Sequence, residues 1–446
     1  MSRPSTTAIL PLLLAACAAP PRAHEERTAE WREREVERDA APEIEIDETA
    51  DLARLLAYAR RHNPGLESAF LSWRQALERV PQATTLPEPR VTFGLYLTAI
   101  ETRVGPRRAR LGLAQPFPWF GKLEAAGRAA LEASEAGRER LAATLLDVEQ
   151  KVRDAWYELA WLEQAIVVTT GHRELLAHWE SVARARMETG LGSHSDVIRA
   201  QVELGKLEDR VQTLVDLRRP IAARLNAALG RPSDAPMPQA ALPLPPPPAI
   251  DEARLAAELE ASSPVLRAIE HRVRAAEHQI ELARTAFYPD FALGLEYGLI
   301  GSARSPGVPG SGDDDLALTL GLELPVWRSS YRAGLREAEA RLGATRAERS
   351  DAANRLSSDL AMALYELRDA ERRVGLFRDS LIPKGEESVQ ALDTAYQSGN
   401  EGFLDLIDAE RVLLEFQLQA ARAESDRAQA LAEAERITGI PLHPEH

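Results

Sequence analysis

The sequence predicts a mainly α-helical protein with a small β part, in which one structural unit occurs twice. Three observations lead to this prediction. Glycines and prolines recur at two fixed spacings, apolar residues follow a sustained 3.5-residue period over long stretches, and four short segments alternate apolar with small or polar residues. In each unit we expect a helix, a β-hairpin and two long antiparallel helices packed as a coiled coil.

The overall composition excludes some classes of function. The chain has 446 residues, a net charge of −15 and 45% hydrophobic residues. It can therefore form a core, and its acidic balance argues against a nucleic-acid partner, which would favour a basic surface. No apolar run reaches the roughly 20 residues of a spanning helix, so a membrane crossing by this chain would use strands.

The first residues have the pattern of a targeting segment. Arg3 precedes a short apolar stretch, which is typical of a signal peptide over residues 1–16. The stretch ends in Leu14-Ala15-Ala16-Cys17, the pattern of a bacterial lipobox, and Cys17 is the only cysteine. We therefore expect lipidation at Cys17 and a lipid-anchored segment over residues 17–50. By resemblance to bacterial lipoproteins, Ala18 after the cysteine favours an outer-membrane location.

Seven Gly and Pro pairs indicate an internal duplication. Three pairs are 200 residues apart: Pro64 with Pro264, Pro89 with Pro289, and Gly94 with Gly294. Four pairs are 209 residues apart: Pro116 with Pro325, Gly190 with Gly399, Gly230 with Gly439, and Pro232 with Pro441. The second copy therefore carries a nine-residue insertion, in an interval whose Gly, Ser and Pro content is typical of a loop. We place the repeats at residues 51–235 and 251–442, with a Pro-rich linker at 236–250 and a tail at 443–446.

Each copy contains one expected β-hairpin, at about residues 90–116 and 290–325. Along each strand one face is continuously apolar and the other is small or polar. Each strand has roughly ten residues, which suits a membrane-spanning strand, although a soluble hairpin packed on the helices is the alternative. Four strands cannot close a barrel, so strands in lipid would require several chains to pair their edges. Trp119 and Trp327, just past the second and fourth strands, fit an interfacial aromatic belt.

Long helices follow each hairpin. Residues 121–189 contain no proline, and apolar residues there repeat in a strict four-three spacing: Leu141, Leu145, Val148, Val152, Ala155, Leu159, Leu162 and Ile166. The second copy repeats this spacing: Leu356, Leu360, Ala363, Leu367, Ala370, Val374, Phe377 and Leu381. We expect the turns between outgoing and returning helices, the tips, at about Gly190 and Gly399.

This duplicated unit behind a lipobox resembles the TolC-type outer-membrane efflux proteins. The residues that carry the resemblance are Asn63-Pro64, the stretch from Gln115 to Lys122, Gly190 with Asp196-Val197, and Gly399 with Asp405-Leu406. The sequence Pro118-Trp119-Phe120-Gly121-Lys122 is more similar to the heavy-metal cation branch than to the drug-efflux branch. The second copy departs from it, because Pro325-Val326-Trp327-Arg328 lacks the Gly-Lys pair.

The resemblance implies a homotrimer in the outer membrane. Its transmembrane strands, four from each chain, would complete a 12-stranded barrel, and its long helices would form an α-barrel in the periplasm. The implied partners are outer-membrane lipid, a periplasmic adaptor and an inner-membrane pump of the RND type. Such a duct conducts substrate passively, so we expect no enzyme activity and no cofactor. The alternatives are the outer-membrane duct of a type I protein secretion system and a periplasmic structural coiled-coil lipoprotein.

Five residues near the tips are candidates for gating. Asp196, Asp405 and Asp408 lie within two helical turns of the tip glycines, and a ring of carboxylates at a constriction favours cations. The alternative is that they are N-terminal acids that match the helix dipole. Gly190 and Gly399 are expected to be adaptor-docking turns or ordinary helix caps. The histidines lack the spacing that places two ligands on one helix face, so we predict no metal site.

Overall fold

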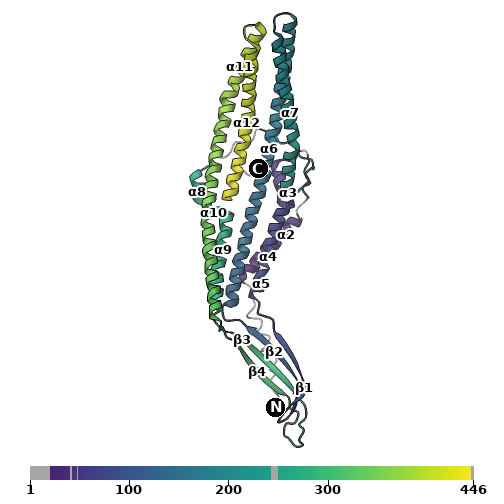
Figure 1. Cartoon of the computed structure of the whole chain (residues 1–446), viewed down its shortest axis with the longest axis vertical. Helices are drawn as coiled ribbons and strands as arrows, with labels where there is room; N and C mark the ends of the chain where they lie inside the picture. Colours follow the sequence, from purple (N-terminus) through teal and green to yellow (C-terminus); the bar gives the residue numbers. More distant parts are fainter. Residues whose placement is uncertain (1–20, 41–42, 48, 243–249, 443–446) are drawn as a thin grey trace. The chain divides into compact units, whose positions relative to one another are not determined.

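The computed structural model describes residues 21–40, 43–47, 49–242 and 250–442 (Figure 1). The expected signal peptide at 1–16, Cys17, part of the linker and the tail at 443–446 lie outside the described residues.

Most of the described chain is helical, which confirms the predicted fold class. The elements of the first half are α2 (Arg22–Ala40), α3 (Leu52–His62), α4 (Pro64–Leu77), α5 (Arg79–Thr84), β1 (Arg90–Thr102), β2 (Gly105–Phe117), α6 (Lys122–Glu188) and α7 (His194–Leu229). Those of the second half are α8 (Glu252–Ser262), α9 (Pro264–Thr285), β3 (Asp290–Ile300), β4 (Asp315–Glu323), α10 (Arg328–Leu376), the π-helix η2 (Phe377–Leu381), α11 (Ile382–Ser398) and α12 (Phe403–Thr438). Among the described residues, no helix combines the length and the apolar composition needed to cross a membrane.

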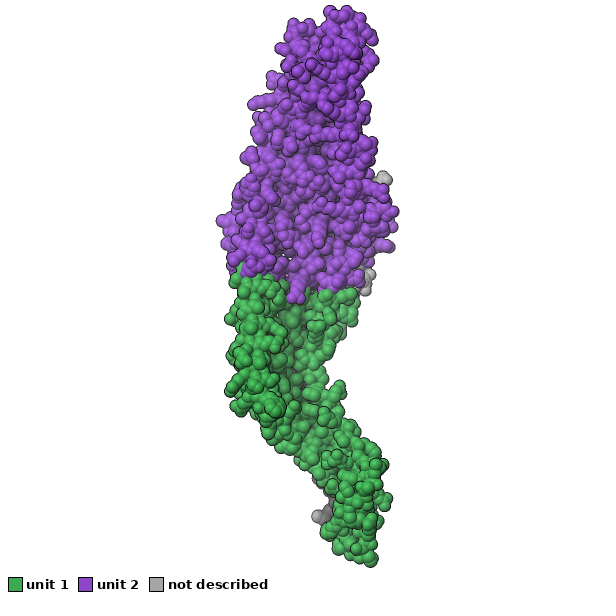
Figure 2. Space-filling model, viewed as in Figure 1, with its two compact units in different colours: residues 1–37, 71–138, 268–350 green, residues 38–70, 139–267, 351–446 purple. Residues whose placement is uncertain are grey.

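The chain folds into two compact units, which Figure 2 shows in green and purple. Unit 1 comprises residues 1–37, 71–138 and 268–350, and unit 2 comprises residues 38–70, 139–267 and 351–446. Each unit combines segments of both halves of the chain, so the units do not coincide with the two sequence repeats. The repeat boundaries therefore remain a sequence prediction.

Unit 1 contains the four-stranded antiparallel sheet, in the order β1-β2-β3-β4. Two hairpins, β1–β2 and β3–β4, are joined by the pairing of β2 with β3, in which Leu111 lies opposite Tyr297 and Leu113 opposite Leu295. β1 and β4 are the two edges of the sheet, so each has one side of its backbone unpaired by another strand of this chain.

The helices of unit 1 bury two large aromatic side chains, Trp31 of α2 and Trp73 of α4, among smaller apolar ones. Trp73 of α4 is fully buried, and Gly137 of α6 lies beneath it, since a β-carbon there would be 3.4 Å from the Trp73 Cα. α2 runs in the same direction as α6, because Arg27 pairs with Glu135 and Glu30 pairs with Arg138 one turn further along both helices.

Unit 2 is a bundle of long helices whose seam follows the predicted four-three spacing. Val152, Ala155, Leu159 and Leu162 of α6 are fully buried in one apolar cluster with Leu225 and Leu229 of α7. Burying each leucine contributes roughly 1.5–3 kcal/mol of transfer free energy.

The repeated glycines and prolines of the sequence meet one another in unit 2. Gly230 ends α7 in a left-handed conformation, and a β-carbon there would lie 2.8 Å from the Pro64 ring. Gly439 ends α12 in the same conformation, and its β-carbon would lie 2.9 Å from the Pro264 ring. The same close contact is therefore built once in each half, which explains why these pairs recur.

Candidate functional site

One face of the sheet is apolar across all four strands. Phe93, Leu111, Tyr297 and Leu316 form one row, because each lies opposite the next in the strand register. The row beside it consists of Val91, Leu113, Leu295 and Leu318. Alternation places the side chains of both rows on the same face.

The other face is small or polar and holds the glycines of the strand interiors. It comprises Thr92, Gly94, Arg110, Gly112, Ala114, Ala292, Gly294, Glu296, Gly298, Asp315, Ala317, Thr319 and Gly321. Because its side chains are small or polar, this face can border water, whereas the first face would be costly to hydrate.

The apolar face is uncovered in the single chain. Leu97 is 90% exposed, Leu318 is 80% exposed and Phe93 is 70% exposed. A contiguous apolar surface of this kind marks contact with lipid or protein rather than with water. The soluble alternative, in which the hairpins pack this face on the chain's own helices, is therefore not what the structure shows.

Aromatic side chains gather where the sheet meets the helices. Trp119 stacks on Tyr288 with ring centroids 5.2 Å apart, and Phe120 lies against both Trp119 and Phe291. Trp327 is 74% exposed. The positions of Trp119 and Trp327 suit the proposed interfacial belt, which stays a prediction; Phe120, also 74% exposed, is a third candidate that the spacing of the tryptophans alone did not indicate.

Asp290 fixes this aromatic junction. Its carboxylate accepts a hydrogen bond from the Trp119 backbone N–H at 2.7 Å and pairs with the Lys122 ammonium at 2.6 Å. The start of β3 is thereby tied to the end of β2 and the start of α6.

The two tips of unit 2 turn on glycines in the left-handed conformation. Gly190 has φ +77° and ends α6, and Gly399 has φ +81° and ends α11. A residue with a β-carbon is strained at such angles, so the glycines act as helix caps whatever else they do. Their expected role in adaptor docking remains a prediction.

The three candidate gate carboxylates have different surroundings. Asp196 is half-buried in the first turn of α7, and its charge acts on Tyr396 of the second tip. Asp405 is exposed in the first turn of α12, where a β-carbon on Gly402 would lie 3.1 Å from its carboxylate. Asp408 is exposed and pairs with Arg411 at 2.9 Å.

Arg411 connects the Asp408 carboxylate to the neighbouring hairpin, because it also hydrogen-bonds Glu203 of α7. Burial disfavours the charged form of Glu203, but hydrogen bonds from Arg411 and Lys206 outweigh burial and lower its pKa. All three candidate carboxylates thus lie near the tips, and their role in a gate remains a prediction.

Sequence reasoning missed Arg186, which contacts both tips. It lies four residues before Gly190, and its guanidinium donates hydrogen bonds to the Tyr396 and Gln397 carbonyls at 2.7 and 2.8 Å. The same guanidinium lies 4.8 Å from the centroid of the Tyr396 ring. A basic residue in the last turn of a helix before a glycine cap was the available signal, but it does not say which carbonyls are reached.

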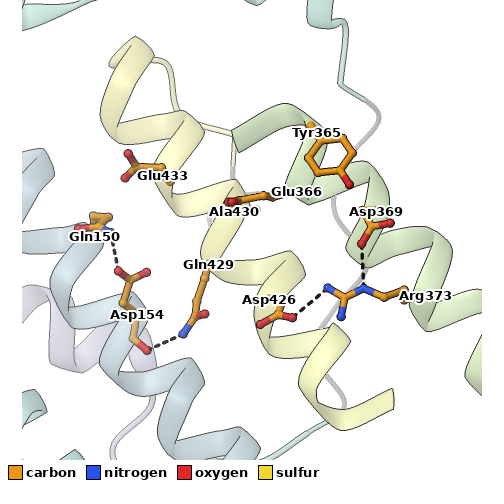
Figure 3. Close-up of a pocket in the computed structure, with 10 residues that line it drawn as sticks. All are labelled: Gln150, Asp154, Tyr365, Glu366, Asp369, Arg373, Asp426, Gln429, Ala430 and Glu433. Atoms are coloured by element: carbon orange, nitrogen blue, oxygen red, sulfur yellow. Dashed lines mark hydrogen bonds and ion pairs between the residues drawn. The ribbon is translucent and has the colours of Figure 1, made fainter. Parts of the chain in front are cut away.

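A polar cavity of about 420 Å³ lies among α6, α10 and α12 of unit 2 (Figure 3). Arg373 pairs there with Asp369 and Asp426, both at 3.0 Å. Burial raises the pKa of Asp154, which also borders the cavity, to about 6. Over the part of the chain that the structure describes, no three His, Cys, Asp or Glu side chains are grouped to hold a metal ion.

His172 of α6 takes part in a buried network of side-chain hydrogen bonds, a hydrogen-bond chain. Its Nδ1 lies 2.8 Å from a Glu410 carboxylate oxygen and its Nε2 lies 3.0 Å from the Gln417 side-chain oxygen. This chain links α6 to α12 inside the bundle.

Comparisons with known proteins agree with this architecture. The cobalt-zinc-cadmium resistance protein CzcC of Cupriavidus metallidurans is 23% identical over 398 residues, which cover 87% of this chain and 90% of CzcC. The pyoverdine export outer membrane protein OpmQ of Pseudomonas putida is 25% identical over 409 residues, which cover 85% of this chain and 84% of OpmQ.

Solved structures share the fold. The outer membrane protein VceC of Vibrio cholerae superposes with a TM-score of 0.72 at 19% identity, covering 88% of this chain and 97% of VceC. The open-state MtrE outer membrane channel of Neisseria gonorrhoeae gives a TM-score of 0.70 at 22% identity, covering 87% of this chain and 88% of MtrE. The sequence model of the outer membrane efflux protein family matches residues 55–231 and 255–439. The chain therefore belongs to the outer membrane efflux protein family.

Proposed function

We propose that three copies of this outer-membrane efflux protein form the exit duct of a tripartite efflux system. The observation that carries the proposal is the apolar sheet face, which is uncovered in the single chain while the opposite face is small and polar. A wall between lipid and a water-filled passage requires this division.

The need for several chains follows from the edges of the sheet. β1 and β4 are unpaired on their outer sides, and unpaired backbone groups in lipid cost several kcal/mol each. Pairing β4 of one chain with β1 of the next removes every edge. Three chains of four strands complete the 12-stranded barrel that the family resemblance implies, and their long helices form the periplasmic α-barrel.

In this duct the tips are the closed end. Asp196, Asp405 and Asp408 supply carboxylates near it, and Gly190 and Gly399 form the turns against which a periplasmic adaptor docks. The energy comes from an inner-membrane pump of the RND type, so the duct itself catalyses no reaction.

We also propose a lipid anchor on Cys17, which the lipobox pattern supports. The pairing of α2 with α6 also supports the anchor. This pairing places Arg22 beside α6, at a point roughly 12 Å along that helix from Lys122 for a rise of 1.5 Å per residue. The five residues back to Cys17 span up to about 17 Å. An acyl chain at Cys17 can therefore reach the aromatic junction at the end of the sheet.

For the cargo we propose divalent metal cations. The Pro-Trp-Phe-Gly-Lys stretch, the similarity to CzcC and the carboxylates near the tips support this choice. Deletion of the gene should sensitise the host to cobalt, zinc or cadmium, and unchanged tolerance to all three would contradict a metal cargo.

Two neighbouring substitutions on β4 test the duct itself. Leu318 lies on the apolar face and Thr319 on the polar face, and both are exposed in the single chain. Leu318→Arg should cost roughly 2–4 kcal/mol if that face borders lipid, whereas Thr319→Arg should be tolerated. The measurement is the yield of heat-modifiable trimer in the outer-membrane fraction. Equal yields for the two variants would contradict a membrane wall.

A further inference from the structure

Gly321 of β4 is a strand glycine that its own chain does not require. Its φ is not positive, and a β-carbon there would meet only Ala292 of β3 among the described residues, at an ordinary contact distance of 3.6 Å. The other side of Gly321 faces no strand of this chain, because β4 is an edge of the described sheet. Glycine weakens a strand interior, and its presence there often marks the close approach of another group.

The internal duplication indicates what that group is. The counterpart of Gly321, 209 residues earlier, is Gly112 of β2. Gly112 lies between two strands, opposite Thr92 of β1 on one side and Glu296 of β3 on the other. A β-carbon on Gly112 would lie 3.6 Å from the Glu296 Cγ. The Glu296 side chain thus lies directly over Gly112, and a residue longer than alanine there would displace it.

The two hairpins pair in the same register, so their residues can be matched. In the first hairpin Gly94 lies opposite Arg110. In the second, their counterparts Gly294 and Thr319 lie opposite each other. In both pairs a β-carbon on the glycine would crowd the facing side chain, at 3.1 Å from the Arg110 Cγ and 2.5 Å from the Thr319 Oγ1. The offsets of 200 residues for the first strand of a hairpin and 209 for the second therefore hold in three dimensions.

Applied to the two neighbours of Gly112, these offsets give Ala292 and Tyr96 as the neighbours of Gly321. Ala292 is the one that the structure shows. Tyr96 lies in β1, at the opposite edge of the sheet, where its hydroxyl accepts a hydrogen bond from Arg107 of β2. Because β2 and β3 lie between β1 and β4, Tyr96 cannot lie beside Gly321 of its own chain. Only Tyr96 of another copy can complete the pair.

We propose that β4 of one copy pairs with β1 of the next in the register that sets Gly321 opposite Tyr96, and that the Tyr96 side chain lies over Gly321 across this seam. The inference rests on the proposed duct function and deepens it. The same register sets Leu322 opposite Leu95 of the next copy, so that the apolar face continues from one chain to the next.

Glycine selects this register over its neighbours. In it Glu323 lies opposite Gly94 of the next copy, which again sets a long side chain against a glycine. A shift of two residues would instead set Tyr96 opposite Thr319 or Glu323, whose side chains occupy the space that its ring needs. Overpacking of this kind is destabilising, so Gly321 fixes the register of the seam.

Disulfide cross-linking in the outer-membrane fraction tests the register. Gly321→Cys combined with Tyr96→Cys should join copies into covalent dimers and trimers on denaturing gels, because directly opposite β-carbons lie about 4.5–5.5 Å apart. Gly321→Cys combined with Gly94→Cys or with Thr98→Cys keeps the same face but shifts the pair by two residues. These shifted pairs should cross-link roughly tenfold less, since their β-carbons lie about 7–8 Å apart.

The matched control is Gly112→Cys with Glu296→Cys, the equivalent pair inside one chain, which shows that a disulfide forms in this setting. The single-cysteine variants report any linkage through Cys17. A wild-type chain that forms no trimer would overturn the duct function itself. A trimer in which a shifted pair cross-links as well as Gly321→Cys with Tyr96→Cys, or in which only the intrachain control forms, would overturn the register.

A second measurement needs no disulfide. Gly321→Leu should lower the yield of heat-modifiable trimer about tenfold, because the leucine occupies the space of the Tyr96 ring. Adding Tyr96→Gly should restore the yield, whereas Tyr96→Gly alone should change it little. Wild-type yield for Gly321→Leu, or no recovery in the double variant, would contradict the contact between Gly321 and Tyr96.

Discussion

The first and second helical hairpins follow one plan but differ in what holds them. α6 runs without interruption for 67 residues, whereas the second outgoing helix passes through the π-helix η2 and restarts as α11 with Pro383 in its first turn. At the tips, Ser193 caps α7 with its side chain, while Gly402 leaves α12 without a side-chain cap. The first hairpin is therefore continuous and self-capped, and the second is interrupted and partly held by the first.

Proline explains the interruption. Pro383 has no N–H to donate to the preceding turn, and its ring would clash with the carbonyl four residues before it in a regular α-helix. The wider π turn of residues 377–381, just before Pro383, accommodates it. At the matching position, 209 residues earlier, α6 has Glu174, which donates its N–H normally and leaves the helix intact.

The largest expected effect comes from exchanging these two residues. Glu174→Pro should destabilise α6 by about 3 kcal/mol or more, because no π turn is present there to accommodate the ring. Pro383→Glu should instead raise hydrogen-exchange protection over residues 377–383. Hydrogen exchange across both helices is the measurement. If Glu174→Pro left the hydrogen exchange of α6 unchanged, the π turn would not be what allows the second hairpin to contain proline.

A smaller effect is expected at Asp154 of the first hairpin, whose counterpart in the second is Ala363. Burial raises the folded pKa of Asp154 to about 6, against 3.8 as its ordinary value. The protonated form is thus favoured on folding, so its contribution to stability is full below about pH 4 and is lost as pH rises through 6.

Asp154→Asn should therefore raise the free energy of unfolding at pH 8 by about 1–2 kcal/mol after allowance for solvent screening, and by much less at pH 4. Thermal midpoints measured across this range would show it. Glu174→Gln, at an exposed site of the same helix, is the control and should show no such pH trend. A pH-independent gain in Asp154→Asn would contradict burial as the cause.

The smallest effects are expected at the caps. Ser193→Ala should weaken the start of α7 by about 1 kcal/mol, since it removes the acceptor for the Ser195 N–H. Gly402→Ser should strengthen the start of α12 by a few tenths of a kcal/mol. Hydrogen-exchange rates of the first-turn amides of α7 and α12 measure both changes. If the two substitutions shifted these rates in the same direction and by the same amount, the two tips would not differ in their helix caps.

Local patterns were sufficient to predict the strands, the long helices and the turns between them. Alternation over Val91–Leu97 and Leu316–Leu322 identified the apolar face, because side-chain direction in a strand depends only on residue parity. The four-three spacing identified the buried seam of α6, and a glycine after each long helix marked its end. These features need no knowledge of distant residues.

Contacts between distant residues required the folded structure. Arg186 reaches carbonyls about 210 residues away, and Gly230 closes on Pro64 more than 160 residues before it. The sequence shows that such residues recur, but a pairing depends on which surfaces the packed helices bring together. Residue type and local period thus establish the elements of this protein, whereas three-dimensional packing alone selects their partners, because hydrogen bonds and close contacts act over a few ångströms of space irrespective of separation along the chain.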